Sequence, residues 1–479
     1  MKNIQTSKRS FILKTRWWWM INCLVWIMVF PSCRKFVTVE NPPDILTSDK
    51  IFTSDKSATA AMLSVYIDMM NDQYGSNGSF VCFTMSSLAG MSADEMTWTQ
   101  NNTTAPYYQQ FSDHALTPDN RYVGAFWSDG YQYIYRANAI MEGLSRATGM
   151  TDSTKAQLGG EARFMRAFCY FYLVNLFGDV PLVLNTDYKS NMNRPRTPAA
   201  TVWNQIITDL KEAETMLSEK YPTAEKLRPN RYTASALLAR AYLYNKRWAE
   251  AETEASAIIN SGIYGTVLPT PALAFKKEST EAIWQLQPVY ANANTPEGGQ
   301  FLTAANTRPN YELSQQLLNA FEPGDNRKTA WIGFSSSANP SWAYPAKYKA
   351  GAGPLTEYYI VFRLAEQYLI RAEARAQQGG KTDLAQADLN VVRSRAGLPN
   401  TTAADGASLL QAVEKERQTE FFAEWGHRWL DLKRTNRAAA VLQPFSPPGA
   451  WKPGSVLYPI PDLEIKANPT LTQNDAYNN

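Results

Sequence analysis

The chain carries few residues in a spacing that supports catalysis. Its two histidines, His114 and His427, lie outside any metal-binding pattern such as H-E-x-x-H. No G-x-S-x-G elbow, P-loop or dinucleotide fingerprint occurs in the sequence. Glycoside hydrolysis needs only two facing carboxylates, and Asp94 with Glu95, close to Trp98, is the one pair of interest. Because adjacent carboxylates more often cap a turn or bind water, we interpret the chain as a non-enzymatic protein without a metal or cofactor.

Cys33 is the residue with the clearest covalent chemistry. It follows a basic start, fourteen mostly apolar residues from Trp17 to Phe30, a proline and a serine. Fourteen residues are too few to span a bilayer as a helix, which takes about 20, whereas this order of segments is typical of a secretory signal. A cysteine directly after the small residue resembles a bacterial lipoprotein cleavage site. We therefore predict a signal peptide over residues 1–32 and an acylated Cys33; an ordinary signal peptide with an incidental cysteine is the alternative.

Charge and cysteine content limit the function classes. The sequence holds 47 basic and 44 acidic residues, but five of the basic ones precede Cys33 and no acid does. The remaining body therefore has 42 basic and 44 acidic residues, a net charge of −2. A near-neutral chain without a block of Lys and Arg offers few cations to bind phosphates, so nucleic-acid binding is disfavoured. The body's other cysteines, Cys82 and Cys169, either pair with each other or remain buried thiols.

Helical periodicity dominates the chain. Apolar residues at three- and four-residue spacing predict helices over Ala58–Met70, Val123–Arg146, Lys155–Leu176, Thr201–Leu217, Arg231–Tyr244, Trp248–Ile259, Tyr359–Gln377, Leu384–Arg395 and Ser408–Ala423. Strand-like material is scarce, and Ala282–Leu286 is one short candidate. The pattern predicts a mainly α protein with little β structure.

One pair of predicted helices follows the tetratricopeptide pattern. Its characteristic positions are Leu238, Ala239, Tyr242, Trp248, Ala251 and Ala255. The small residues let two helices approach closely, and the large ones wedge between neighbouring repeats. Leu384, Ala387 and Val391 repeat the second helix of such a unit. We predict a scaffold of about four tetratricopeptide-like helical pairs.

Two long polar stretches interrupt this scaffold. Residues 71–121 and 262–357 are rich in Gly, Pro, Asn, Ser and Thr, which favour loops. They also hold aromatic residues, which makes disorder less plausible and a binding role more so. The sequence has 14 Trp, 25 Tyr and 20 Phe. Most of these rings must lie in the core, but a surplus would suit a protein that binds flat ligands. We expect a helical scaffold that carries an elaborated loop face.

Four blocks follow one another along the chain: Glu161–Ala167 with Phe177–Leu182; Arg363–Glu366 with Tyr368–Ala374; Glu416, Arg417 and Glu420 with Gly426–Trp429 and Asp431–Arg434; and Tyr458–Pro461 with Asn468, Pro469, Gln473 and Asn474. Together these blocks resemble the SusD/RagB family of nutrient-binding outer-membrane lipoproteins. With Cys33, the resemblance covers the chain to its last residues. It implies that residues 33–479 form a single SusD-like α-helical domain.

The resemblance also implies a function. A SusD-like lipoprotein captures nutrient at the cell surface and passes it to a TonB-dependent β-barrel transporter of the SusC type. The ligand is an oligosaccharide or polysaccharide in one branch of the family and a peptide in the RagB branch. The implied location is the outer membrane, lipid-anchored and facing outward. Arg34 and Lys35, rather than acids, follow Cys33, so retention on the inner leaflet of that membrane is the alternative.

A glycan presents C–H faces to aromatic rings and hydroxyls to amide, carboxylate and guanidinium groups. Trp98 with Asn101 and Asn102, and Tyr290 with Asn292, are mixtures of this kind. Each ring alone is more often packing than platform. The candidate ligand-binding residues are Trp98, Asn101, Tyr107, Tyr290, Trp331 and Trp342.

The polar residues of the C-terminal block have a simpler interpretation. Glu416, Glu420 and Glu424 recur every four residues, and such a stripe is usually a solvated or salt-bridged helix face. Gly426 is placed to end that helix in a left-handed cap. Two other functions stay open beside nutrient capture: a tetratricopeptide adaptor that binds only protein in a helical groove, and, less favoured, a secreted glycosidase.

Overall fold

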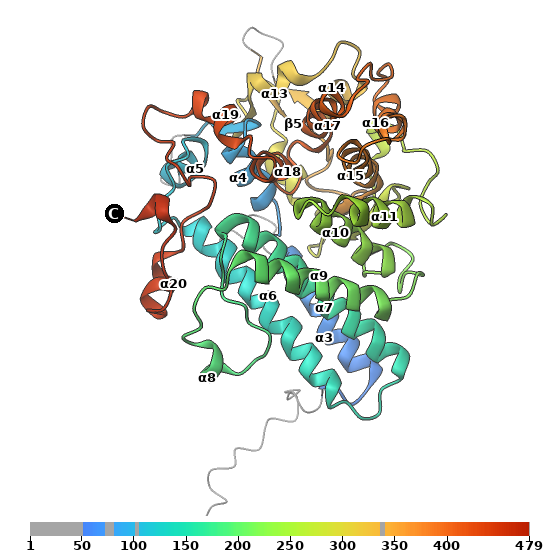
Figure 1. Ribbon diagram of the computed structural model, residues 1–479, viewed down its shortest axis with the longest axis vertical. Coiled ribbons are helices and arrows are strands. Elements are labelled where there is room, and N and C mark those ends of the chain that lie inside the picture. The colour runs from blue at the N-terminus through green and yellow to red at the C-terminus, as the bar shows by residue number, and fades with distance from the viewer. Residues whose placement is uncertain (1–50, 72–80, 101–104, 336–340, 479) are drawn as a thin grey trace, which may run out of the picture. The chain divides into compact units, whose positions relative to one another are not determined.

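The computed structural model describes residues 51–71, 81–100, 105–335 and 341–478 (Figure 1). All of these residues belong to one compact unit, residues 51–479. Helices make up most of it, which confirms the mainly α prediction. The predicted signal peptide and Cys33 lie outside the described residues.

Ten longer helices build the scaffold within the described residues. They are α3 (Asp55–Asn71), α6 (Arg121–Ser145), α7 (Asp152–Phe177), α9 (Ala199–Met216), α10 (Arg231–Tyr244), α11 (Trp248–Ile259), α15 (Leu364–Ala376), α16 (Thr382–Arg395), α17 (Gly406–Phe421) and α18 (His427–Arg434). From α6 to α16 each packs on the next in this order, and α17 packs on α15, α16 and α18. The pairs α7 with α9, α10 with α11, α15 with α16 and α17 with α18 make four units, as predicted.

Local chemistry explains where these helices start and stop. The Thr151 hydroxyl caps α7, and Gly178 ends it at a φ of 74° that a residue with a side chain rarely adopts. Asn230 and Thr233 form a capping box at the start of α10. The alanines that the tetratricopeptide pattern places between α10 and α11, Ala251 among them, are fully buried, because only small side chains allow this helix approach.

The two polar stretches hold short elements as well as loops. Before α6 they are α4 (Thr84–Ser92), β1 (Met96–Trp98) and α5 (Ala105–Ser112). After α11 come η2 (Pro271–Leu273), β2 (Ala282–Leu286), α12 (Pro296–Phe301), β3 (Tyr311–Leu313), α13 (Gln315–Ala320), α14 (Asn326–Trp331), β4 (Ile332–Phe334) and β5 (Ala343–Pro345). The remaining elements are α8 (Tyr188–Asn191), β6 (Tyr359–Arg363), α19 (Ala438–Leu442), η3 (Gln443–Phe445), α20 (Asp462–Ala467) and η4 (Asp475–Tyr477).

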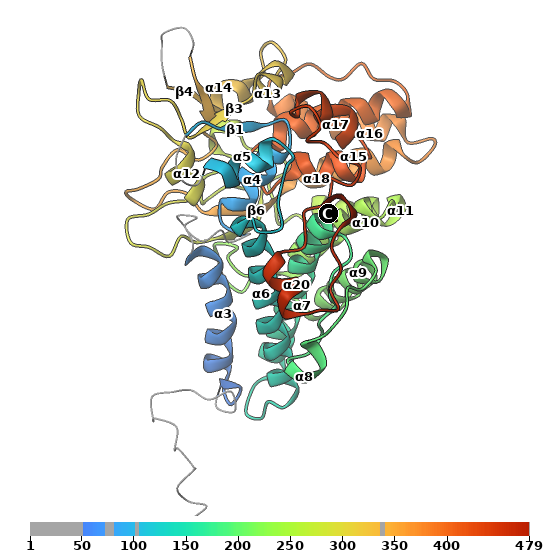
Figure 2. The same cartoon turned by 90° about the vertical axis from the view of Figure 1, so that its left-hand side faces the viewer.

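The strands form three antiparallel pairs: β1 with β3, β2 with β6, and β4 with β5. Strand β2 matches the predicted strand. The prediction of a helix from Tyr359 was wrong for its first five residues, because that aromatic and β-branched run pairs with β2 before the helix begins. Figure 2 shows the small strands, α4 and α5 together at one end of the unit and α3, α6 and α7 extending away from them.

Cys82 and Cys169 are both buried, and they do not form a disulfide with each other. Cys169 lies inside α7, and the Cys82 thiol donates to the carbonyl of Met69. In the part of the chain that the structure describes, no helix has the length and apolarity to cross a membrane.

Candidate ligand-binding site

Strand β1 places Trp98 beside three tyrosines. In the β1–β3 ladder Trp98 lies opposite Tyr311, so both side chains stand on the same face of the pair, with ring centroids 5.0 Å apart. Tyr108 of α5 stacks on Trp98, with centroids 4.3 Å apart and planes 24° apart. Tyr122 lies in the first turn of α6, and its ring centroid is 4.8 Å from that of Tyr108. We call Trp98, Tyr108, Tyr122 and Tyr311 the aromatic cluster.

Polar contacts fix the cluster to the scaffold. Asn120 caps α6 by accepting hydrogen bonds from the backbone of Tyr122 and Val123, and its amide donates to the Tyr107 carbonyl at 3.0 Å. The Tyr122 hydroxyl donates to the Tyr108 hydroxyl at 3.0 Å. Burial raises the pKa of Tyr108, so its hydroxyl stays protonated at neutral pH. These hydrogen bonds join the start of α6 to helix α5, which lies in the first polar stretch.

The cluster combines buried and accessible rings. Tyr122 and Tyr311 are buried, whereas Trp98 and Tyr108 are only partly covered. Tyr107, the predicted neighbour, is also partly exposed, and the guanidinium of Arg121 lies 5.9 Å from its ring. An accessible indole backed by a second ring, with hydroxyl and guanidinium donors nearby, can stack on a flat ligand and donate hydrogen bonds to it.

The other predicted residues are spread more widely. Asn101, with Asn102, lies outside the described residues. Trp342 is partly buried just before β5, which lies beside β3, and its carbonyl accepts a hydrogen bond from Ser335. Tyr290 is 43% exposed, and its hydroxyl donates to the Asn71 carbonyl at 2.6 Å. The structure therefore brings Trp98 and Tyr107 together and leaves Tyr290 on a different segment.

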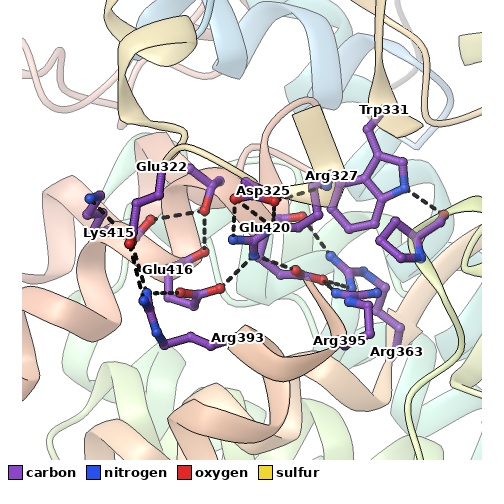
Figure 3. Close-up of polar contacts among 12 residues, drawn as sticks. Glu322, Asp325, Arg327, Trp331, Arg363, Arg393, Arg395, Lys415, Glu416 and Glu420 are labelled. Carbon is purple, nitrogen blue, oxygen red and sulfur yellow. Dashed lines mark hydrogen bonds and ion pairs between the residues drawn. The ribbon is translucent and has the colours of Figure 1, made fainter. Parts of the chain in front are cut away.

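Trp331 does not have the accessible ring that the prediction required. It is fully buried in α14, and its indole N–H donates to the Pro271 carbonyl at 2.7 Å. The Lys347 ammonium lies 4.6 Å from the centroid of the Trp331 ring, and the Arg395 guanidinium, which Figure 3 shows, lies 5.0 Å from it. Because cations lie over the Trp331 ring, the ring has no free face on which a ligand could stack. We therefore remove Trp331 from the candidate set.

Trp331 covers a buried ion cluster. Arg327 donates to Asp325 at 2.8 Å, to Glu416 at 2.6 Å and to Glu420 at 2.9 Å (Figure 3). Glu420 also pairs with Arg363 and Arg395. Burial opposes ionisation of Glu420, but the three guanidiniums outweigh it and hold its pKa well below the usual range. The predicted stripe of glutamates is thus salt-bridged and buried rather than solvated.

The chain turns sharply between α17 and α18, and this corner connects the ion cluster to the strand that carries Trp98. Ala423, Trp425 and Gly426 all have positive φ. Gly426 has the predicted left-handed conformation, but it precedes α18 rather than ending the previous helix, because α17 already stops at Phe421. A Cβ at Gly426 would lie 2.6 Å from the side chain of Ala89 in α4, which only glycine avoids.

Asp94 and Glu95 tie the same corner to β1. Arg428 donates two hydrogen bonds to Asp94, at 2.8 and 2.9 Å. Glu95 is buried and accepts from the backbone N–H of Ala423 at 3.1 Å. Burial raises the Glu95 pKa to about 8, so its carboxyl is mostly protonated at neutral pH. Asp94 and Glu95 each make a separate contact within the scaffold, so they do not form the facing pair of carboxylates that glycoside hydrolysis needs.

Both histidines are buried in the scaffold. His114 contacts the Ser92 carbonyl and the Ser446 hydroxyl, each at 2.8 Å. Burial, and then the charges of Arg240 and Arg417, hold the pKa of His427 well below its usual value. No group of three or more His, Cys, Asp or Glu side chains suited to a metal ion occurs within the described ranges.

The candidate set predicted from the sequence left out Tyr108, Tyr122, Tyr311 and Arg121. Tyr108 directly follows a residue that was singled out, and an asparagine before an apolar helical pattern is an N-cap signal that locates Arg121 and Tyr122 at the start of α6. Tyr311 had no such signal, because its pairing with Trp98 spans more than two hundred residues.

The helical side of the unit has a groove of its own. A cavity of about 530 Å³ lies between the ends of α10, α15, α17 and α18. Its lining includes Trp248, Leu410, Gln377, Gln411 and Asn436. The lining also holds seven charged residues: Lys246, Glu373, Glu414, Arg417, Asp431, Arg434 and Arg437. A groove that mixes apolar, amide and charged groups suits contact with another polypeptide.

Two family models match the chain. Residues 44–243 match a family described as starch-binding and associating with the outer membrane, and residues 326–477 match the SusD family. A SusD-like protein of Formosa agariphila is 23% identical over 94% of this chain and 96% of its own length. The starch-binding protein SusD of Bacteroides thetaiotaomicron is 35% identical over 24% of this chain and 21% of its own.

Solved structures agree with these sequence matches. A laminarin-binding SusD-like protein is 26% identical and superposes with a TM-score of 0.73, over 89% of this chain and all of its own. A surface glycan-binding protein of Bacteroides fluxus, 22% identical over 89% of this chain and all of its own, has a TM-score of 0.74 and shows the shared fold. The matched families describe binding proteins rather than enzymes.

Proposed function

Because this chain belongs to the SusD/RagB family, we propose that it binds a glycan at the outer membrane and delivers it to a SusC-like TonB-dependent transporter. The observation that carries the proposal is the partly exposed stack of Trp98 on Tyr108, held rigidly by α6 and by the β1–β3 ladder. The starch- and laminarin-binding names of similar proteins support a glycan as the ligand class.

The stack has the properties that a sugar ring requires. A pyranose lays its C–H face on an indole, and a ring that is already stacked on its far side loses little freedom on binding. Tyr107 is partly exposed on the same short helix as Tyr108. We keep Trp98, Asn101, Tyr107, Tyr290 and Trp342 as proposed ligand contacts and add Tyr108.

The proposal includes an anchor and a partner. Acylation of Cys33 would hold the protein on the outer membrane, facing outward. A binding protein without a pore needs a channel, and the helical-pair side is the proposed docking surface, which leaves the aromatic cluster for ligand. Affinity purification from the native host in mild detergent tests this part: a large β-barrel should copurify, and repeated recovery of this chain alone would argue against a transport role.

A protein-binding adaptor is the second candidate, because the groove between α10, α15, α17 and α18 has the composition of a peptide site. A peptide nutrient of the RagB type is the third. An array that carries both glycans and peptides, probed with soluble protein that begins after Cys33, separates the candidates by the class of ligand retained.

The site itself is tested by Trp98→Ala, with Tyr188→Ala as the matched control. Tyr188 is 73% exposed on α8 and belongs to no part of the proposed site. Stacking is worth on the order of 1 kcal/mol beyond buried area, so calorimetric titration should show several-fold weaker glycan binding for Trp98→Ala only. Equal affinity in Trp98→Ala, with a thermal melt that confirms folding, would place the ligand site elsewhere.

A further inference from the structure

Arg121 is an exposed cation beside the aromatic cluster, and no carboxylate of the described residues pairs with it. Its guanidinium donates to the Tyr122 hydroxyl at 2.6 Å and lies 4.7 Å from the centre of that ring. Among the described residues it takes part in no ion pair. The four residues between β1 and α5 that the description leaves out, Asn101 to Thr104, include no acid in the sequence.

Stability of the fold does not account for this arginine. Arg121 is the first residue of α6, where the helix dipole disfavours a positive charge. The first turn of α6 holds no acidic residue that would offset it. The buried arginines of the ion cluster differ, since Arg327 and Arg363 each pair with more than one carboxylate. Because Arg121 stabilises neither its helix nor an internal ion pair, its charge is available outside the protein.

Nearby acids are directed elsewhere. Glu312 lies opposite Thr97 in the β1–β3 ladder, so it stands on the other face of the strands from Trp98 and Tyr311, and it pairs with Arg308. Asp119, two residues before Arg121, is exposed and forms no ion pair with it in the described chain. A ligand at the aromatic cluster therefore meets a guanidinium that no ion pair within the described residues neutralises.

We propose that Arg121 pairs with an oxyanion of the bound glycan, so that the preferred ligand is an acidic polysaccharide carrying carboxylate or sulfate groups. This inference rests on the proposed glycan site. Tyr108 and Tyr122 lie between the guanidinium and Trp98, so the charged group belongs to a sugar unit other than the one that stacks on the indole. The planar guanidinium matches an oxyanion with two parallel N–H donors, which a neutral hydroxyl cannot use as fully.

The test compares one glycan backbone in three charge states. The probes are a laminarin oligosaccharide, the same oligosaccharide with its primary alcohols oxidised to carboxylates, and a sulfated form. The wild-type protein should bind at least one acidic form about three- to tenfold more tightly than the neutral form at low salt. Added salt should reduce that preference, because an exposed ion pair is screened. The two acidic forms show whether the oxyanion is a carboxylate or a sulfate.

Two variants isolate the residue. Arg121→Gln should lose the preference for the acidic forms, and Arg121→Lys should keep part of it. The matched control is Arg146→Gln, at the other end of the same helix, where an exposed arginine is also without an ion pair; the preference should remain. Arg121→Gln loses the guanidinium contacts with Tyr122, so a small loss of stability is expected in that variant, and thermal melts check that all three variants remain folded.

The outcomes separate this inference from the proposed function. If the wild-type protein binds the neutral oligosaccharide as tightly as both acidic forms, or if Arg121→Gln retains the preference, the acidic-glycan inference is overturned and glycan binding stands. If none of the three forms binds, glycan binding at the aromatic cluster and the role of Arg121 are overturned together.

Discussion

Asp94 and Arg428 form a two-bonded ion pair that joins the start of strand β1 to helix α18. The two distances are 2.8 and 2.9 Å, and both side chains are at least nine-tenths buried. Trp98 lies only four residues beyond Asp94, at the end of strand β1, which begins two residues after Asp94. The pair therefore connects the proposed ligand contact to the corner that the ion cluster holds in place.

Removing one member of this pair should destabilise the protein strongly. Asp94→Ala leaves the buried Arg428 guanidinium with only the longer contact to Glu414, at 3.4 Å, and breaking a buried pair in this way typically costs about 3–5 kcal/mol of unfolding free energy. Arg428→Met should cost a similar amount, and the double variant should cost less than the sum of the two. Urea denaturation of the four proteins measures the coupling. Strictly additive losses would mean that the pair contributes no specific link.

The lipid anchor gives a prediction that concerns location. Cys33→Ala should move the protein from the outer-membrane fraction to the soluble periplasmic fraction, since stable anchoring requires two or more acyl chains. Cys82→Ala is the matched control, because this thiol is buried in the folded unit and should not affect fractionation. A Cys33→Ala protein that stays in the membrane fraction would contradict lipidation at this position.

The sequence predicted the scaffold well, since local periodicity decides it. The bounds of α10, α11 and β2 agree with the expected ranges to the residue, and the four helical pairs follow from small residues at fixed positions. The helix expected from Tyr359 failed for its first turn, because pairing with β2, some seventy-five residues earlier, decides that segment. Long-range pairing of this kind leaves no local signal.

The candidate site could be predicted only in part. Trp98 and Tyr107 were found because aromatic residues stand out in a polar stretch. Trp331 stands in a similar stretch, yet contacts with Pro271 and Lys347 bury it, and neither contact can be read from the local sequence. A tryptophan in a polar stretch of sequence can therefore either cover buried charges or bind a ligand, and the local sequence does not distinguish the two.

That difference between the two tryptophans is measurable. Trp331→Ala should lower the unfolding free energy by roughly 3–5 kcal/mol, because it empties a fully buried site and removes cation–π contacts with Lys347 and Arg395. Trp331→Phe, which keeps a ring, should cost less. Glycan affinity of the folded protein should be unchanged in both. Full stability with lost affinity would restore Trp331 as a ligand contact.

Glu95 makes stability depend on pH in a direction opposite to that of most carboxyls. Burial raises its pKa to about 8 in the folded protein, whereas an unfolded glutamate titrates near about 4.3. Between these values the folded state holds a proton that the unfolded state has released, so raising the pH favours unfolding. The stabilisation is complete below the unfolded pKa and is lost as the pH rises through about 8.

Glu95→Gln should remove this dependence while keeping an oxygen that accepts from the Ala423 N–H. The two proteins should be similarly stable at pH 5, and the variant should become the more stable one as the pH rises toward 9, by at most about 1.4 kcal/mol per pH unit. Chemical denaturation across this range measures the difference. Glu322→Gln is the control. The hydrogen bond from Arg393 lowers the pKa of Glu322 to about 2, so the stability that the ionised Glu322 contributes is lost only in acid. The difference in stability between this variant and wild type should therefore stay constant between pH 5 and 9. Parallel curves for wild type and Glu95→Gln would show that the Glu95 carboxyl ionises normally, with water reaching its unpaired oxygen.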